Sequence, residues 1–151
     1  MLDQLIEKLE AKEDMMIALR RHMHENPELS FQEEKTSQFI QDCYEGKPVQ
    51  IDRIPDRYGF VVTINPGKSD NVLALRADFD ALPIKELNDL PFKSHVDGKM
   101  HACGHDMHTA YLMGLADALI ELRDEIPGTI KIIHQHAEEM PPGGSRELIK
   151  A

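Results

Sequence analysis

The segment from His101 to His108 holds three histidines, one cysteine and one aspartate within eight residues, just before a predicted helix. Thiolate and imidazole groups are good ligands for zinc and similar ions. Gly104 separates Cys103 from His105, and glycine lets the backbone bend tightly enough for both side chains to reach one point. Taken alone, the segment leaves two interpretations open: a metal site, or a buried structural cysteine beside histidines that pack or cap.

Two adjacent carboxylates, Glu138 and Glu139, follow a predicted buried strand at Thr129–Gln135. Open α/β sheets place their sites at the carboxyl ends of strands. At such a point one carboxylate can bind a metal ion while the other takes a proton from an activated water. The alternative is a solvated acidic pair on a loop.

A third cluster, Asp78-Phe79-Asp80, follows the predicted strand Val72–Ala77. A carboxylate there can orient a histidine ligand through its second ring nitrogen, although a strand-end turn or helix cap is also common for aspartate. Three strand-end or loop clusters of metal-compatible residues together favour a shared metal site.

These clusters need an α/β framework to position them, and the apolar periodicity predicts one. Asn26-Pro27 should end the first helix. Ser30 with Glu33 three residues later has the spacing of a capping box for the second, which should end near Gly46. The predicted helices cover residues 2–25, 31–44 and 109–122, with a last one from about 146 capped by Ser145; the predicted strands are 49–54, 59–64, 72–77 and 129–135, and 81–100 is a loop.

The 151 residues carry a formal net charge of -10. Negative charge repels phosphate backbones and anionic lipid, so we expect neither a nucleic-acid nor a membrane partner. No apolar run approaches the roughly 18 residues of a transmembrane helix. Cys43 and Cys103 do not form a disulfide framework, which favours a reduced, cytoplasmic protein.

With these residues in view, the chain resembles the metal-dependent amidohydrolases, the group of aminoacylases, hippurate hydrolases and auxin-conjugate hydrolases related to carboxypeptidase G. The resemblance covers nearly the whole chain, and its His-Ala-Cys-Gly-His-Asp string is highly specific. It is carried by Arg76–Ile84, Met100–Ala110, Gln135–Glu139 with Pro142-Gly143-Gly144, and an N-terminal signature at Arg21–His24 with Asn26–Ser30.

The resemblance implies a zinc-exopeptidase-like, three-layer catalytic α/β domain that binds two divalent metal ions. Cys103, His105 and Glu139 match metal ligands, Glu138 matches the general base, and Asp80 matches a position that orients a ligand. Zn and Mn fit best, with Co and Ni also suited to such ligands. The implied reaction is hydrolysis of the amide bond of an N-acyl amino acid or a small peptide.

Two departures from the family pattern matter. His136 stands where many relatives have proline, and its effect on the site is open. The chain is also less than half the length of such relatives, and the last predicted helix stops after about one turn. We therefore expect residues 1–151 to be the N-terminal portion of the catalytic domain, without the lid (dimerisation) domain and the C-terminal half.

This length leaves alternatives to an active enzyme. The chain could be a catalytically inactive fragment that acts as an interaction or assembly partner, or forms a homo-oligomer through its exposed faces. A purely structural zinc site is a third reading, but such sites are closed and four-coordinate. Three candidate ligands beside a glutamate pair fit an open hydrolytic site better.

Overall fold

A four-stranded mixed sheet forms the centre of the chain in a computed structural model, which describes residues 1–150. Its order is β1 (Gln50–Arg53), β2 (Phe60–Ile64), β4 (Thr129–Gln135) and β3 (Val72–Asp78). β2 pairs antiparallel with both β1 and β4, whereas β3 and β4 run parallel. A parallel pair needs a crossover, and helix α4 (His105–Glu121) supplies it between the two strands.

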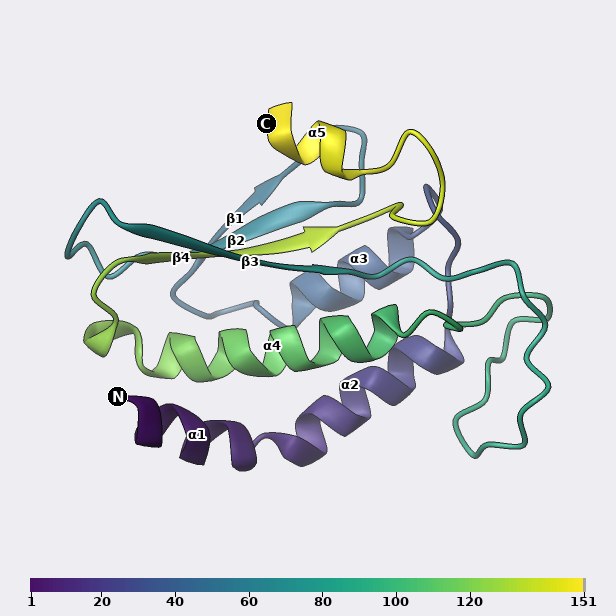
Figure 1. Cartoon of the computed structure of the whole chain (residues 1–151), viewed down its shortest axis with the longest axis horizontal. Coiled ribbons are helices and arrows are strands. Elements are labelled where there is room, and N and C mark those ends of the chain that lie inside the picture. The colour runs from purple at the N-terminus through teal and green to yellow at the C-terminus, as the bar shows by residue number, and fades with distance from the viewer. Residues whose placement is uncertain (151) are drawn as a thin grey trace.

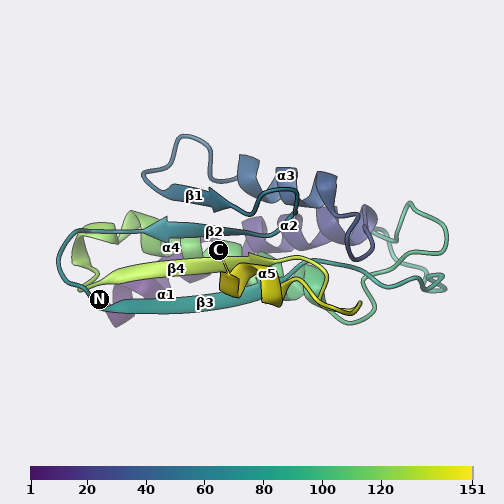
Figure 2. The same cartoon turned by 90° about the horizontal axis from the view of Figure 1, so that it is seen from above.

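Helices lie on both faces of this sheet (Figures 1 and 2). α4 packs directly beneath the sheet, and α1 (Leu2–Glu10) and α2 (Glu13–Glu25) lie along α4 on its far side. α3 (Glu34–Asp42) lies on the same side near β1 and β2, and the short α5 (Ser145–Lys150) lies above the opposite face. The predicted α/β class with helices on both faces of the sheet is confirmed.

The apolar core lies between the sheet and α4. Phe60, Val62 and Ile64 alternate inward along β2, as a half-buried strand requires, and Ile132 on β4 is fully buried beside them. Ala116 of α4 is also fully buried. β4 lies at the centre of the sheet, but its burial alternates: Ile132 and His134 are buried, whereas Lys131 is exposed. The predicted strand is therefore present and is buried mainly on the face toward α4.

Two of the predicted helices differ from the structure. The single helix expected over 2–25 is two helices, because Lys12 leaves helical geometry (φ -104, ψ 7) and its side chain reaches Asp117 and Glu121 of α4. α4 begins at His105, earlier than the expected 109, because its N-cap, Gly104, adopts a left-handed conformation (φ 102) that turns the chain into the helix at the next residue.

The predicted capping box at Ser30 and Glu33 is wrong. Helix α3 begins at Glu34, and the exposed first turn is capped from further back by Glu28, whose Oε2 accepts hydrogen bonds from the backbone N (2.7 Å) and Oγ1 (2.8 Å) of Thr36. Ser30 and Glu33 point to other parts of the molecule. Residues 81–100 contain no helix or strand, as expected, apart from two isolated bridges, one between Ala81 and Leu29 and one between Leu82 and Met100.

Among residues 1–150, none of the helices combines the length and the apolar character needed to cross a membrane.

Candidate metal centre

The three sequence clusters meet at one edge of the sheet. β3 and β4 are parallel neighbours, with Asp78 opposite Gln135, so the residues that follow them emerge side by side. Asp80 comes from the end of β3, and Glu138 and Glu139 come from the loop after β4. His105, the first residue of α4, faces both strand ends from the side.

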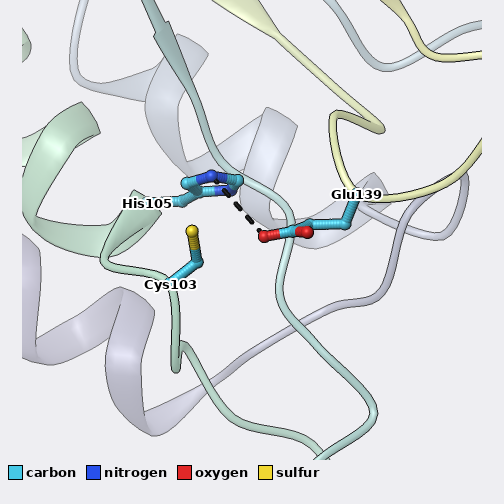
Figure 3. Close-up of side chains that lie close together, drawn as sticks. All are labelled: Cys103, His105 and Glu139. Atoms are coloured by element: carbon cyan, nitrogen blue, oxygen red, sulfur yellow. Dashed lines mark ion pairs between the residues drawn. The ribbon is translucent and has the colours of Figure 1, made fainter.

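Cys103, His105 and Glu139 converge on one point (Figure 3). Each offers one ligand atom, and these atoms lie within 4.8 Å of one another. The Nε2 atom of His105 is 3.8 Å from Oε1 of Glu139, and the Cys103 sulfur lies beside the imidazole ring. This spacing lets a single small cation contact all three groups.

A second trio shares His105 with the first. Asp78, His105 and Glu138 also offer ligand atoms within 4.8 Å of one another. His105 Nε2 lies 3.4 Å from Oδ1 of Asp78 and 3.9 Å from Oε2 of Glu138. Sequence reasoning treated Asp78 only as a residue that could orient a histidine, because its spacing from the other clusters was not visible along the chain.

Asp80 lies behind His105, on the side away from the two trios. Its backbone oxygen is 3.0 Å and its Oδ1 3.2 Å from Nδ1 of His105. Its other oxygen, Oδ2, accepts hydrogen bonds from Oγ of Ser30 (2.6 Å) and the backbone N of Glu139 (3.0 Å). Asp80 thus holds the His105 ring and the Glu139 backbone in a fixed relation.

The pKa values in the site reflect its excess of negative charge. Burial lowers the pKa of His105, but its hydrogen bond to the Asp80 carboxylate and the charges of Asp78 and Asp80 outweigh it and raise that pKa to about 9. Burial opposes ionisation of Asp80, yet its hydrogen bonds with His105 and Ser30 lower its pKa to about 2. The Glu139 carboxylate raises the pKa of the Cys103 thiol, and burial adds to this.

This donor set fits a divalent cation. Asp78, Asp80, Glu138 and Glu139 place four carboxylates around one imidazole, and Oε1 of Glu139 is buried without a hydrogen-bond partner among residues 1–150. A bound cation would satisfy that oxygen and offset the mutual repulsion of the carboxylates. It would also displace the proton from the thiol, because only the thiolate binds metal.

Sequence reasoning missed a buried polar network that holds the start of α4. Nδ1 of His24 lies 2.7 Å from Oδ2 of Asp106, and its Nε2 lies 3.1 Å from Oε1 of Glu86. Arg20 donates to the same Asp106 oxygen at 2.8 Å. His24 belonged to the N-terminal signature, but nothing in the local pattern indicated a partner 82 residues away.

His136 belongs to neither trio. Its side chain is fully buried, and its Nε2 lies 3.2 Å from Oε2 of Glu147 in α5. The ring fills a space that only glycine permits at two neighbouring positions: a Cβ added to Gly59 or Gly144 would come within 2.6 Å or 2.7 Å of its Nδ1 atom. His136 therefore packs the loop after β4 against α5 and the turn before β2.

Comparison with known proteins places this chain in a family. The model of peptidase family M20/M25/M40 matches residues 74–151. An N-acyl-L-amino acid amidohydrolase of Geobacillus stearothermophilus is 47% identical over 143 residues, which cover 94% of this chain and 38% of that protein. An N-acetylcysteine deacetylase of Bacillus subtilis is 46% identical over 137 residues, covering 90% of this chain and 36% of that one.

A solved structure has both the same fold and a related sequence. The Bacillus subtilis YXEP protein, described as a dinuclear metal-binding peptidase of the M20 family, superposes with a TM-score of 0.87 at 44% identity. The match covers 93% of this chain and 39% of that one. The chain thus spans well under half the length of these relatives. The matched model covers both strand-end clusters and the His101–His108 segment, and on this evidence the chain belongs to peptidase family M20/M25/M40.

Proposed function

We propose that the protein to which this chain belongs hydrolyses the amide bond of N-acyl amino acids or small peptides with the help of two divalent metal ions. The observation that carries the proposal is the convergence of Cys103, His105 and Glu139 on one point, with the carboxylates of Asp78 and Glu138 beside them. Relatives named amidohydrolase and deacetylase, and a neighbour described as dinuclear, support it.

In this proposal Cys103, His105 and Glu139 are metal ligands, and Asp78 is an additional candidate ligand beside His105 and Glu138. Bound ions would supply Lewis acidity toward the amide carbonyl and would lower the pKa of a water molecule toward neutrality. Zn and Mn are the leading candidates, and Co or Ni would also suit a set of sulfur, nitrogen and oxygen ligands.

Glu138 is the proposed general base. Its side chain is 43% exposed and its Oε2 lies 3.9 Å from His105 Nε2, so it borders the candidate ligands and is still open to solvent. From there it can accept the proton of the attacking water and return it to the leaving amine. Glu138 and Glu139 also line a cleft of about 640 Å³ with Arg76 and Arg146, through which a small substrate could enter.

Residues 1–151 carry one part of the proposed site. The relatives are more than twice as long, and we propose that their additional length supplies the remaining ligands, the lid domain and the contacts to substrate. With so few protein ligands the chain alone should bind metal weakly and hydrolyse N-acetyl amino acids poorly or not at all. Robust hydrolysis by the purified chain would overturn this part of the proposal.

Cobalt titration of two variants tests the assignment of roles. Wild-type protein should bind Co²⁺ and show thiolate-to-cobalt charge-transfer absorption. Cys103→Ser should lose that absorption and most of the affinity, whereas Glu138→Gln should keep both because the base is not required as a ligand. Equal loss in both variants would instead indicate a closed structural site, and no binding by the full-length wild-type protein would reject the proposed function.

A second candidate function rests on the exposed edge of the sheet. Within residues 1–150 β3 pairs only with β4, and Val72 and Leu73 at its start are 58% and 55% exposed. A catalytically inactive chain could use this edge to bind another subunit or a second copy. Light scattering over a concentration series, which measures the molar mass in solution, tests this second function. A stable monomer would count against an assembly role.

A further inference from the structure

A buried carboxylate that is distant in sequence from the metal candidates supports the loop that carries two of them. Glu33 has no exposed surface, and its Oε1 accepts a 2.7 Å hydrogen bond from the backbone N of Ala137, 104 residues along the chain. Ala137 directly precedes Glu138 and Glu139. The contact therefore joins the segment before α3 to the acidic pair of the site.

Ala137 has an unfavourable backbone conformation. Its φ is 48°, in the left-handed region, which is unfavourable for a residue with a Cβ. Such conformations persist only where the surroundings impose them. Glu33 holds the N–H of Ala137, and Gly144 donates to its carbonyl oxygen at 2.9 Å. These two bonds fasten both sides of the turn that directs the chain from β4 toward Glu138.

Burying Glu33 is itself costly. Its Oε2 has no hydrogen-bond partner within the described part of the chain, and burial raises the pKa of its carboxyl group to about 7. Helix α3 does not require this residue as a cap, because Glu28 already serves Thr36. The contact with Ala137 is therefore the interaction that accounts for the position of Glu33.

Ser30, three residues earlier, supports the other half of the site in the same manner. Its hydroxyl donates to Oδ2 of Asp80, the residue that holds His105. One short segment, residues 30–33, thus contacts the end of β3 through Ser30 and the loop after β4 through Glu33.

We propose that Glu33 is a positioning residue for the metal centre, which holds Ala137 in its left-handed conformation and thereby aims Glu138 and Glu139 at His105. The expected effect on metal affinity rests on the proposed function, whereas the claim that Glu33 holds Ala137 rests on the hydrogen bond between them. Residues that orient metal ligands from behind typically change metal affinity by about 10–100-fold when they are replaced.

Metal affinity of substituted chains tests the consequence. Glu33→Ala should weaken Co²⁺ binding by about 10–100-fold, while Glu33→Gln, which keeps an oxygen acceptor for Ala137, should stay close to wild type. Glu33→Asp keeps the carboxylate but is one methylene too short, and should weaken binding as well. If Glu33→Ala does not fold, the Co²⁺ affinity of Glu33→Asp tests the positioning role instead.

Glu28→Ala is the matched control. It removes a carboxylate from the same segment and leaves a helix amide without its acceptor, but it does not touch the loop after β4. It should lower the midpoint of urea unfolding without changing the Co²⁺ affinity of the folded protein. If Glu33→Ala and Glu33→Asp bind Co²⁺ as tightly as wild type, or if Glu28→Ala loses as much affinity, the inference is wrong.

Hydrogen exchange separates this inference from the proposed function. In metal-free protein, Glu33→Ala and Glu33→Asp should increase exchange at the amides of Ala137 and Glu139, whereas Glu28→Ala should not. If wild-type protein binds no Co²⁺ but this pattern appears, the proposed function fails and the positioning contact stands. Unchanged exchange at Ala137 in both Glu33 variants would overturn the inference whatever the metal result.

Discussion

The Nδ1 atom of His105 lies between two oxygens of Asp80, 3.0 Å from the backbone oxygen and 3.2 Å from Oδ1. The opposite ring nitrogen, Nε2, consequently faces Asp78, Glu138 and Glu139. A histidine held through one nitrogen presents the other in a defined direction, which is how proteins orient imidazole ligands. The relation between these two residues therefore determines where a cation could sit.

Replacing Asp80 should weaken metal binding without removing a ligand. Asp80→Asn keeps one acceptor for His105, but its amide nitrogen or its altered charge disturbs the bonds to Ser30 and the Glu139 backbone. We expect Co²⁺ affinity to fall by about 10–100-fold, measured by titration. Asp97→Asn, on an exposed loop residue paired only with Lys85, is the control and should bind like wild type.

Gly144→Ala should disrupt the loop after β4. A Cβ at this position would lie 2.1 Å from the backbone oxygen of His136, which cannot move as a flexible side chain could. Gly46→Ala is the control, because Gly46 has a positive φ (73°) but no atom within 4 Å of an added Cβ. It should cost only about 1–2 kcal/mol of backbone strain, and urea unfolding should show a clearly larger loss for Gly144→Ala.

Stability should fall as the solution is acidified, in part because of His134. Burial lowers the pKa of this histidine to about 3 in the folded chain, against an ordinary value of 6.5. Below pH 6.5 the unfolded chain binds a proton that the folded chain does not, so the free energy of unfolding decreases as pH falls toward 3. In His134→Gln the thermal midpoint should depend less steeply on pH between 6.5 and 4.

The quantity to compare is the change of the thermal midpoint with pH, and not its absolute value. His134→Gln also alters the contact with the Tyr44 hydroxyl, which lies 3.0 Å from Nε2 of His134, and this shifts stability at every pH. His101 is buried with a pKa lowered to about 4 and should preserve part of the acid sensitivity. An identical slope in wild type and variant would show that His134 accepts a proton in the folded chain.

His24→Phe should be strongly destabilising. The variant leaves Glu86 and Asp106, both buried, without the imidazole that lies between them, although Arg20 still pairs with Asp106. Removing one member of a buried charged network costs about 3–5 kcal/mol. His22→Phe, at an exposed position two residues earlier on α2, should change the urea midpoint little; equal effects would refute a special role for His24.

Much of the fold follows from local pattern. The alternation in Phe60–Ile64 and the apolar run in Thr129–Gln135 predicted the strands, because side-chain burial along a strand follows its period of two or its position at the centre of a sheet. The helix boundaries were less predictable. The helix breaks at Lys12, whose side chain contacts acidic residues of α4 more than 100 residues away.

The sequence by itself determined the kind of chemistry, because Cys103, His105, Glu138 and Glu139 are metal-compatible groups whatever surrounds them. Only the tertiary structure decided which residues support them. Ser30 and Glu33 have the spacing of a helix cap. However, the free N–H groups at the start of a helix can donate to any nearby oxygen, and here Oε2 of Glu28 is the acceptor. The hydroxyl of Ser30 is therefore free to bond Asp80, 50 residues away, and the carboxylate of Glu33 is free to bond the backbone N of Ala137, 104 residues away. Both contacts give a buried polar group a hydrogen-bond partner.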